Sequence, residues 1–266
     1  MNWGGCARSW ADGRLGRRKI HYFRKFMRLE FGKLSEDECL LCGATGRLTG
    51  EHKIKASLLK DEFGNRPMRM TGKDTPKILQ SPRSKHAHFR AKICLECNSS
   101  RTQKADKAFD RLHQRLKKLR LEGKQITNIG DLPNYELTPQ DNTEPFRYLA
   151  KILSCYLAEV GGLRSRSISA FALGLTDKNP ILLKICKDEQ YETKLHQMET
   201  KGFAEHGGLK VRFDDKKKWV QSLESSLAVG GIRYEFWVQL GWILKWELCL
   251  RHREFVRKGL LNLAQD

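Results

Sequence analysis

Two Cys-x-x-Cys pairs constrain this chain more than any other feature of its sequence. The first is Cys39 with Cys42, and the second is Cys94 with Cys97. Two cysteines at this spacing on a tight turn can direct both sulfurs at one ion, and two such pairs complete a tetrahedral zinc site. The alternatives are two disulfides or four buried thiols, but disulfides within Cys-x-x-Cys suit redox enzymes, and nothing else here has thioredoxin-like character. We therefore expect these four cysteines to hold a structural zinc ion.

The 51 residues between the pairs exceed a simple zinc ribbon and contain a second candidate site, Glu51-His52. Adjacent residues on a strand point to opposite faces, so a carboxylate could bind a divalent cation while the imidazole takes a proton from water. Asn98 directly follows the second pair, where a helix would begin, and its amide oxygen is a hard ligand suited to Mg²⁺. Taken alone, Glu51-His52 is weak evidence, because a lone surface histidine is the commoner interpretation.

The order Cys-x-x-Cys, acidic residue-His, Cys-x-x-Cys-Asn resembles the HNH nucleases with a ββα-metal fold. It is most similar to the zinc-stapled branch that includes phage endonuclease VII, and the resemblance covers about residues 35–120. The resemblance implies a structural zinc at the four cysteines. It also implies a catalytic divalent cation, Mg²⁺ or similar, held by Glu51 and Asn98, with His52 as the general base.

The sequence departs from this family's pattern at two positions. Glu51 stands where the family usually has Asp, and the central Asn of the motif has no clear counterpart. Asn65 is the only Asn between His52 and Cys97, and it lies in a loop-like run. His86 and His88 are candidates for the central role, with the alternative that both are histidines of a surface loop.

The charge balance indicates a polyanionic partner. Fifty Lys and Arg residues against 31 Asp and Glu give a net charge of +19, and nucleic acid is the usual partner of such a chain. A helix is predicted from Asn98 to about Leu121, because apolar residues recur there at intervals of three and four. Its apolar stripe is Ala105, Phe109, Leu112, Leu116 and Leu119. Beside that stripe lies a basic one, which is either a set of phosphate contacts or a solvated face: Lys104, Arg111, Arg115 and Lys118.

Composition divides the chain into four segments. Residues 1–34 form a basic arm in which an amphipathic helix is predicted at about 18–31. Residues 35–121 form the nuclease-like unit, and within it we expect a long surface loop over 65–92. Turn-forming residues make 122–145 a predicted linker. Residues 146–266 are expected to form a mixed α/β domain of unknown role, through which a partner protein or a second copy of the chain could bind.

Within the C-terminal domain, hydrophobic spacing predicts individual elements. A helix is expected from residue 146 to about 160, and strands are expected at 181–185 and 232–240. Alternating apolar residues extend the strand prediction over 242–250. Gly207-Gly208 indicates a hairpin between two strand-like pieces.

Cysteine usage and hydropathy indicate the compartment. Four of the eight cysteines are scattered, which fits a reducing compartment and predicts a cytoplasmic protein. The N-terminus lacks the apolar region of a signal peptide, and no charge-free run is long enough for a membrane span.

We therefore expect an α+β protein, in which a ββα-metal unit with a four-cysteine zinc site precedes a mixed α/β domain. The expected function is metal-dependent hydrolysis of phosphodiester bonds in DNA, a chemistry used by phage, defence and mobile-element systems. Two alternatives stay open: a non-catalytic zinc-stapled nucleic-acid-binding module, and a nuclease directed at RNA.

Overall fold

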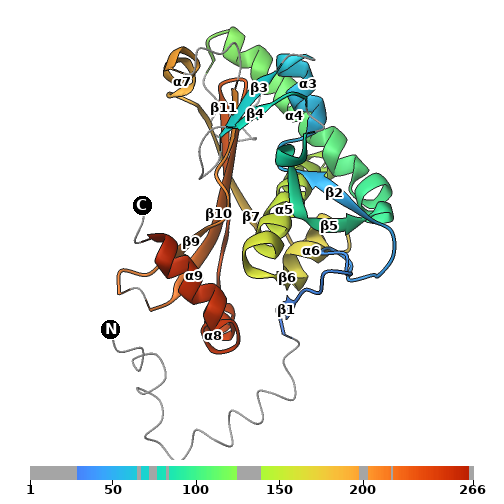
Figure 1. The fold of residues 1–266 in the computed structure, drawn as a ribbon, viewed down its shortest axis with the longest axis vertical. Coiled ribbons are helices and arrows are strands. Elements are labelled where there is room, and N and C mark those ends of the chain that lie inside the picture. The colour runs from blue at the N-terminus through green and yellow to red at the C-terminus, as the bar shows by residue number, and fades with distance from the viewer. Residues whose placement is uncertain are drawn as a thin grey trace, which may run out of the picture.

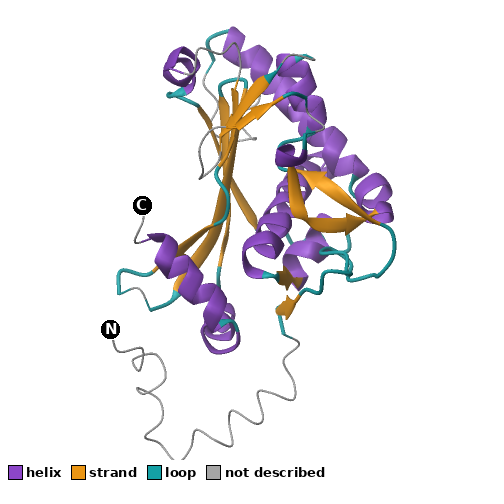
Figure 2. Ribbon diagram, in the orientation of Figure 1, coloured by secondary structure: helices purple, strands orange, loops and turns teal. Residues whose placement is uncertain are grey.

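The computed structural model describes residues 29–64, 67–71, 77–81, 84–124, 139–197, 203–216 and 218–263. These residues form a mixed α+β fold, as the sequence predicts (Figure 1, Figure 2). The helix predicted for the basic arm at 18–31 falls almost wholly outside the described residues, as does Asn65. Within the described part of the chain, no helix combines the length and apolar character needed to cross a membrane.

A seven-stranded mixed sheet is the largest sheet in the described part of the chain. All its pairings are antiparallel except the one between β3 and β8, and β9 joins it by pairing with β10. The strands along the main path are β4 (Lys77–Leu79), β3 (Met68–Thr71), β8 (Phe203–His206), β10 (Val220–Val229), β11 (Ile232–Gln239) and β7 (Ile181–Lys187), with β9 at Lys210–Phe213.

The long β10–β11 hairpin follows from simple alternation. Ile232, Tyr234, Phe236 and Val238 are buried, while the residues between them are more exposed. The connecting turn is Gly230-Gly231, with φ of 58° and 73°, the left-handed conformation that two-residue hairpin turns require. The strands predicted at 181–185 and 232–240 are confirmed as β7 and β11.

Three helices lie along one side of the sheet (Figure 1): α4 (Gln103–Leu121), α5 (Pro139–Gly161) and α6 (Arg166–Ala172). The predicted apolar stripe of α4 is buried at every position, so this helix is confirmed. The strand pair β2 (Leu48–His52) and β5 (His88–Cys94) lies on the outer side of α5. The result is three layers, with α5 between the sheet and the β2–β5 pair.

Smaller elements complete the fold. Strand β1 (Phe31–Lys33) pairs with β6 (Leu163–Ser165). The buried carboxylate of Glu247, on α8 (Trp242–Arg251), accepts the backbone N–H groups of Glu30 (3.0 Å) and Phe31 (2.8 Å). These contacts join the start of the described chain to α8. The remaining elements are β1 (Phe31–Lys33), α3 (Ala56–Phe63), η1 (Lys85–Ala87), η2 (Cys97–Arg101), β6 (Leu163–Ser165), α7 (Tyr191–Gln197), α8 (Trp242–Arg251) and α9 (Arg253–Leu263).

The loop expected over 65–92 is wrong, because β3, β4, η1 and the start of β5 all fall in this range. The range is rich in polar residues and proline, and its apolar residues are sparse. Nevertheless, the apolar residues that enter the core are almost fully buried: Met68, Met70, Leu79, Ala87 and Phe89. Strand β3 pairs with β8, far along the chain, and Phe89 packs on Tyr156 of α5, which no local pattern reveals.

The strand expected over 242–250 is also wrong, since these residues form α8. Apolar residues at every second position fit the period of a strand. Residues four apart in the same set also fit one face of a helix, so this pattern does not distinguish the two. Trp242, Trp246 and Leu250 share such a face of α8 and are exposed, whereas Leu248 on another face is fully buried.

The hairpin expected at Gly207-Gly208 is wrong, because β8 and β9 do not pair with each other but follow one another along β10. Both β8 and β9 pair antiparallel with β10, with His206 opposite Leu227 and Lys210 opposite Glu224. The chain advances four residues from His206 to Lys210, whereas β10 advances three from Glu224 to Leu227. The segment between β8 and β9 therefore has one extra residue, as in a β-bulge. Gly207 approaches β10 so closely that an added Cβ would lie 2.3 Å from Ser226 Oγ. A side chain at this position would have to displace the Ser226 hydroxyl and would press on the backbone of β10.

The boundary predicted at 122–145 does not divide the hydrophobic core. Helix α5 begins at Pro139, inside the predicted linker, and β3 pairs with β8 across the predicted boundary. Buried apolar residues from both predicted units belong to one continuous cluster. The β2–β5 unit and the large sheet therefore share one core.

Candidate functional site

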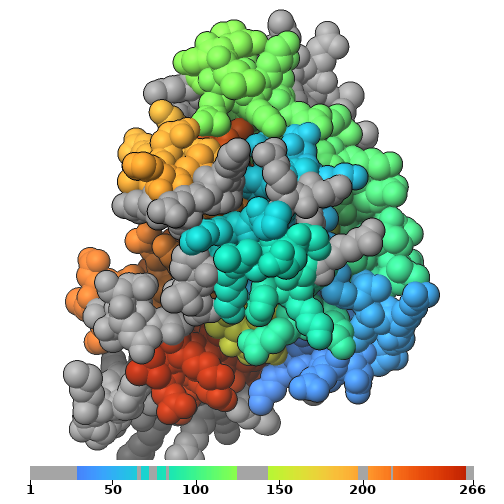
Figure 3. Space-filling model, turned by 45° about the horizontal axis from the view of Figure 1, so that its top comes forward, coloured from blue at the N-terminus to red at the C-terminus, as the bar shows by residue number. Residues whose placement is uncertain are grey.

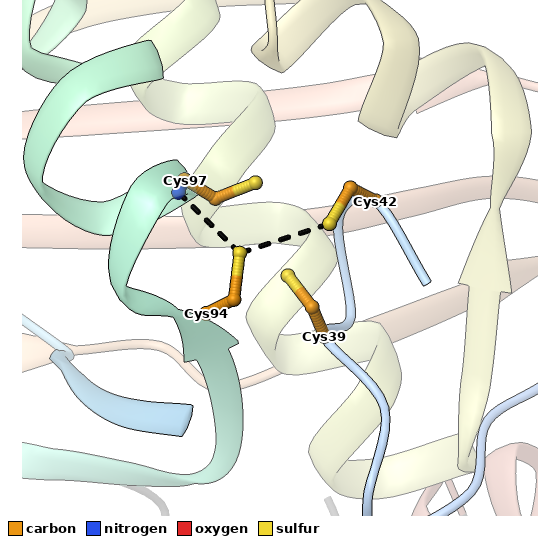
Figure 4. Close-up of side chains that lie close together, drawn as sticks. All are labelled: Cys39, Cys42, Cys94 and Cys97. Carbon is orange, nitrogen blue, oxygen red and sulfur yellow. Dashed lines mark hydrogen bonds between the residues drawn. The ribbon is translucent and has the colours of Figure 1, made fainter. Parts of the chain in front are cut away.

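The four cysteines of the two pairs converge from two parts of the chain (Figure 4). Cys39 and Cys42 lie on a tight turn, closed by hydrogen bonds from Gly43 N to Cys39 O (2.8 Å) and from Cys39 N to Ala44 O (2.9 Å). Cys94 ends β5, and Cys97 begins the wide turn η2. None of the four is in a disulfide, and their sulfur atoms all lie within 4.8 Å of one another.

The spacing of the sulfurs fits a tetrahedral metal site. Cys42 Sγ and Cys94 Sγ are 3.7 Å apart, whereas a disulfide would bring them to about 2.05 Å. A tetrahedron with zinc–sulfur bonds of about 2.3 Å has edges of about 3.8 Å. Backbone N–H groups of Ala44 and Cys97 point at the sulfurs of Cys42 and Cys94, each at 3.5 Å. The cluster can therefore hold a zinc ion with the predicted ligands.

Acid–base properties of the cluster favour the same conclusion. A hydrogen bond with the Cys97 side chain lowers the pKa of Cys39 to about 4, and the same hydrogen bond raises the pKa of Cys97. Burial raises the pKa of Cys42. Metal ligation requires thiolates, and thiols this close resist ionising together without a cation. A divalent ion would supply the missing positive charge.

Two histidines face each other where β2 and β5 pair. Their register slips between Gly50, opposite Lys92, and His52, opposite His88, so β5 has two extra residues there. Such irregularities re-aim side chains and recur next to active sites. The rings of His52 and His88 lie 3.9 Å apart between centroids, with their planes at 44°. Nδ1 of His88 lies 3.0 Å from Ser84 O, and because a carbonyl only accepts, Nδ1 carries the proton of this hydrogen bond.

Asn98 lies beside the same stretch of β2. Its Nδ2 donates to Thr49 Oγ1 (3.0 Å) and to Gly50 O (3.4 Å), which orients the amide and leaves Oδ1 to accept or ligate. The His88 ring also lies against Gly50, because a Cβ added there would be 3.4 Å from His88 Cδ2. Asn98 and His88 therefore meet at Gly50, two positions before His52.

Glu51 points away from this group into the protein. It is 5% exposed, and its Oε1 lies 3.3 Å from the Nζ of Lys151 on α5. The same ammonium lies 2.5 Å from Asp106 Oδ1 on α4. Burial raises the pKa of Glu51, against the opposing effect of Lys151. Burial also disfavours the charged form of Lys151, but the carboxylates of Glu51 and Asp106 outweigh it and raise the pKa of Lys151.

The donor atoms at the predicted cation site suit Mg²⁺ in kind, since carboxylate and amide oxygens are its usual protein ligands. The amide of Asn98 is already oriented for such a role. The carboxylate of Glu51 is instead paired with an ammonium group. A cation can use Glu51 only by replacing Lys151 at this carboxylate or by sharing it.

Helix α4, which carries the predicted basic stripe, is seen in green at the surface of the molecule (Figure 3). Lys104, Arg111 and Lys118 are exposed, Arg115 is partly buried, and Lys107, which the predicted stripe omitted, is also exposed. The two acidic residues of α4 are drawn into ion pairs, Asp106 with Lys151 and Asp110 with Lys55 (2.5 Å each). The exposed positions of α4 therefore include four basic residues and no acidic residue.

Sequence reasoning missed Lys151. The available signal was its place in α5, where Tyr148, Ile152 and Cys155 surround it and every one of them is buried. A lysine at such a position requires acidic partners, but those partners lie on β2 and α4 and cannot be identified from α5 alone.

Comparisons with protein-family models, with curated proteins and with solved structures found no match for this chain. Its function must therefore be inferred from the residues and contacts described above.

Proposed function

We propose that this chain is a metal-dependent endonuclease of the HNH type that hydrolyses phosphodiester bonds, with DNA as the preferred substrate. The observation that carries the proposal is the order of parts around Gly50. The antiparallel pair β2–β5 leads through η2 into α4, and the four-cysteine cluster joins the start of the unit to the β5–η2 junction. His52 ends the first strand, and Asn98 is the second residue of the turn into the helix.

His52 acts as the general base in this proposal. A neutral imidazole there takes a proton from the attacking water, and the facing ring of His88 restricts the orientations that His52 can adopt. The hydrogen bond of His88 to Ser84 O fixes the second ring in turn. A bound divalent cation would supply charge stabilisation at the leaving oxygen. Asn98 would hold it through its amide oxygen, and Glu51 would join only on leaving Lys151.

The zinc ion has a structural role in this proposal. It ties the turn carrying Cys39 and Cys42 to the end of β5 and the start of η2. Asn98 directly follows the ligand Cys97, so the metal site fixes the position of the amide relative to β2. Loss of zinc should therefore displace Asn98 from Gly50 before it affects the distant sheet.

Substrate binding is assigned to the exposed basic face of α4. Lysine and arginine side chains on one helix face contact backbone phosphates without reading sequence. Helix α4 begins two residues after η2, so its first turn follows Asn98 closely in the chain.

The second candidate is a non-catalytic zinc-stapled module that binds nucleic acid. The observation that favours it is the ion pair of Glu51 with Lys151, which occupies a proposed cation ligand. Incubation of plasmid DNA and of RNA with wild-type protein and with His52→Ala, each with Mg²⁺, separates the candidates. Cleavage by the wild type alone supports the nuclease, and preferred cleavage of RNA would change the substrate. Binding without cleavage by the wild type supports the module.

A further inference from the structure

Lys151 is the least exposed of the lysine, arginine, aspartate and glutamate residues that the structure describes, at 1%. It comes from α5, in the half of the chain that the nuclease resemblance does not cover, yet it reaches Glu51 beside the proposed catalytic histidine. We propose that Lys151 is an internal counter-ion that a divalent cation must displace from Glu51, so that Lys151 sets the cation concentration which the site requires. This inference rests on the proposed function in taking Glu51 as a cation ligand.

The charges around Lys151 explain why an ammonium can stay there. Removing a lysine from water costs several kcal/mol even after relaxation, and Glu51 and Asp106 offset that cost from two directions. The ring of Tyr148 adds a cation–π contact, with Nζ 5.4 Å from its centroid. The ionised group of two carboxylates and one ammonium carries a net charge of −1, which favours a further cation.

The two contacts of Lys151 are unequal, and the difference makes exchange at Glu51 feasible. Its Nζ lies 2.5 Å from Asp106 Oδ1 but 3.3 Å from Glu51 Oε1. A divalent cation at Glu51 would therefore compete with the longer ion pair, between Lys151 and Glu51, while the ammonium keeps its shorter contact with Asp106. Asp106 itself is held at its backbone carbonyl by Lys55 Nζ (2.5 Å). Asp106 thus provides a fixed position to which Lys151 can withdraw.

Lys151→Met tests the proposal, because methionine keeps the length and apolar stem but removes the charge. Zinc-loaded wild type and K151M are titrated with Mn²⁺, followed by electron paramagnetic resonance and by the thermal midpoint. We expect K151M to bind one Mn²⁺ at least about tenfold more tightly, because no ammonium then competes for Glu51. A tenfold gain corresponds to about 1.4 kcal/mol of binding free energy. Its thermal midpoint should also rise more on adding Mn²⁺ than that of the wild type, because a ligand of the folded state stabilises it.

Two further variants define the origin of any gain. K151M/E51Q should lose the tighter Mn²⁺ binding, since the ligand is then absent. Lys53→Met is the matched control, because Lys53 follows His52 and pairs with Glu159 at 3.9 Å, outside the Lys151 group. It should bind Mn²⁺ as the wild type does.

K151M leaves two buried carboxylates without a counter-ion, so it is purified with Mn²⁺ present throughout. K151M/D106N, which removes one charge of each sign, serves if K151M alone does not fold. Wild-type Mn²⁺ affinity in whichever variant folds overturns the proposal, as does tighter binding that survives Glu51→Gln. Failure of both variants to fold in Mn²⁺ also overturns it, because a cation able to replace the ammonium would rescue them. Tighter Mn²⁺ binding through Glu51, with no cleavage by any form, would instead sustain this inference and refute the nuclease.

Discussion

Glu51 and His52 are neighbours in the chain, but the structure places them in different surroundings. His52 is partly exposed and faces His88, whereas Glu51 is buried against Lys151. The separation follows from the strand, which sends adjacent side chains to opposite faces. The proposed base and the proposed cation ligand can therefore be tested independently, because their side chains contact different residues.

His52→Ala should abolish most cleavage while leaving the protein intact. Loss of a general base typically costs about 10²–10⁴-fold in rate, and His52 is no ligand of the four-cysteine cluster. Cleavage of plasmid DNA, zinc content and DNA binding are measured on the same preparations. Because only a neutral imidazole accepts a proton, wild-type cleavage should also rise from acid toward neutral pH. Wild-type rates in His52→Ala, with contaminating nuclease excluded, would refute the assigned base.

At the scale of single residues, the sequence carries enough information for the cysteines but not for Glu51. Cysteine pairs at this spacing have few other uses, so Cys39, Cys42, Cys94 and Cys97 could be identified from spacing alone. The environment of Glu51 depends on Lys151, which lies on a helix of the other predicted domain. No local pattern connects the two.

At the scale of elements, we expect the turn from β5 through η2 into α4 to depend on metal binding by the four cysteines. Cys94→Ser should lower the zinc content and reduce the amount of folded, soluble protein, because a structural zinc contributes directly to folding. Zinc is measured by a colorimetric chelator and folding by circular dichroism. Cys249→Ser is the matched control, since Cys249 lies on α8 outside the cluster. Full zinc content in Cys94→Ser would contradict the four-cysteine site.

The basic face of α4 should account for much of the salt dependence of DNA binding. Replacing Lys104, Lys107 and Arg111 with Gln should weaken binding. The slope of log affinity against log salt concentration should become shallower by about 0.9 for each phosphate that is no longer neutralised. The matched control replaces three exposed lysines elsewhere, Lys178, Lys184 and Lys187, in or near β7. Fluorescence anisotropy over a range of salt concentrations measures both. Equal effects of the two triple variants would mean that α4 contributes only to the overall charge.

Elements were predictable where one stretch of chain carries its own period. Helix α4 shows an apolar stripe at intervals of three and four, and β11 shows clean alternation, so both are confirmed. Strands β3 and β4 are short, and their partner β8 follows much later. Helix α8 has a pattern that fits two periods, and its amphipathic character is weak because Trp242 and Trp246 are exposed.

At the scale of the whole molecule, α5 joins the two predicted halves. It packs between the large sheet and β5, carries Lys151 to Glu51, and accepts the backbone N–H of Arg90 through Glu159 (2.7 Å). A second polar contact links α4 to the large sheet, where the fully buried His113 forms a hydrogen bond with the hydroxyl of Tyr234 on β11 (2.8 Å). The nuclease-like unit is therefore held to the rest of the chain by polar contacts as well as by the shared core.

A chain cut between the halves should consequently stay together. A specific protease site inserted within residues 125–138 leaves the elements on either side unchanged, and β3 still pairs with β8 across the cut. After cleavage, the two fragments should co-elute in gel filtration and keep zinc, because separating them would expose a continuous apolar core. A fragment ending at residue 124 and expressed alone should be insoluble or unfolded, since it lacks both β8 and Lys151. Recovery of that fragment as a soluble, zinc-loaded domain would show instead that residues 35–121 fold independently.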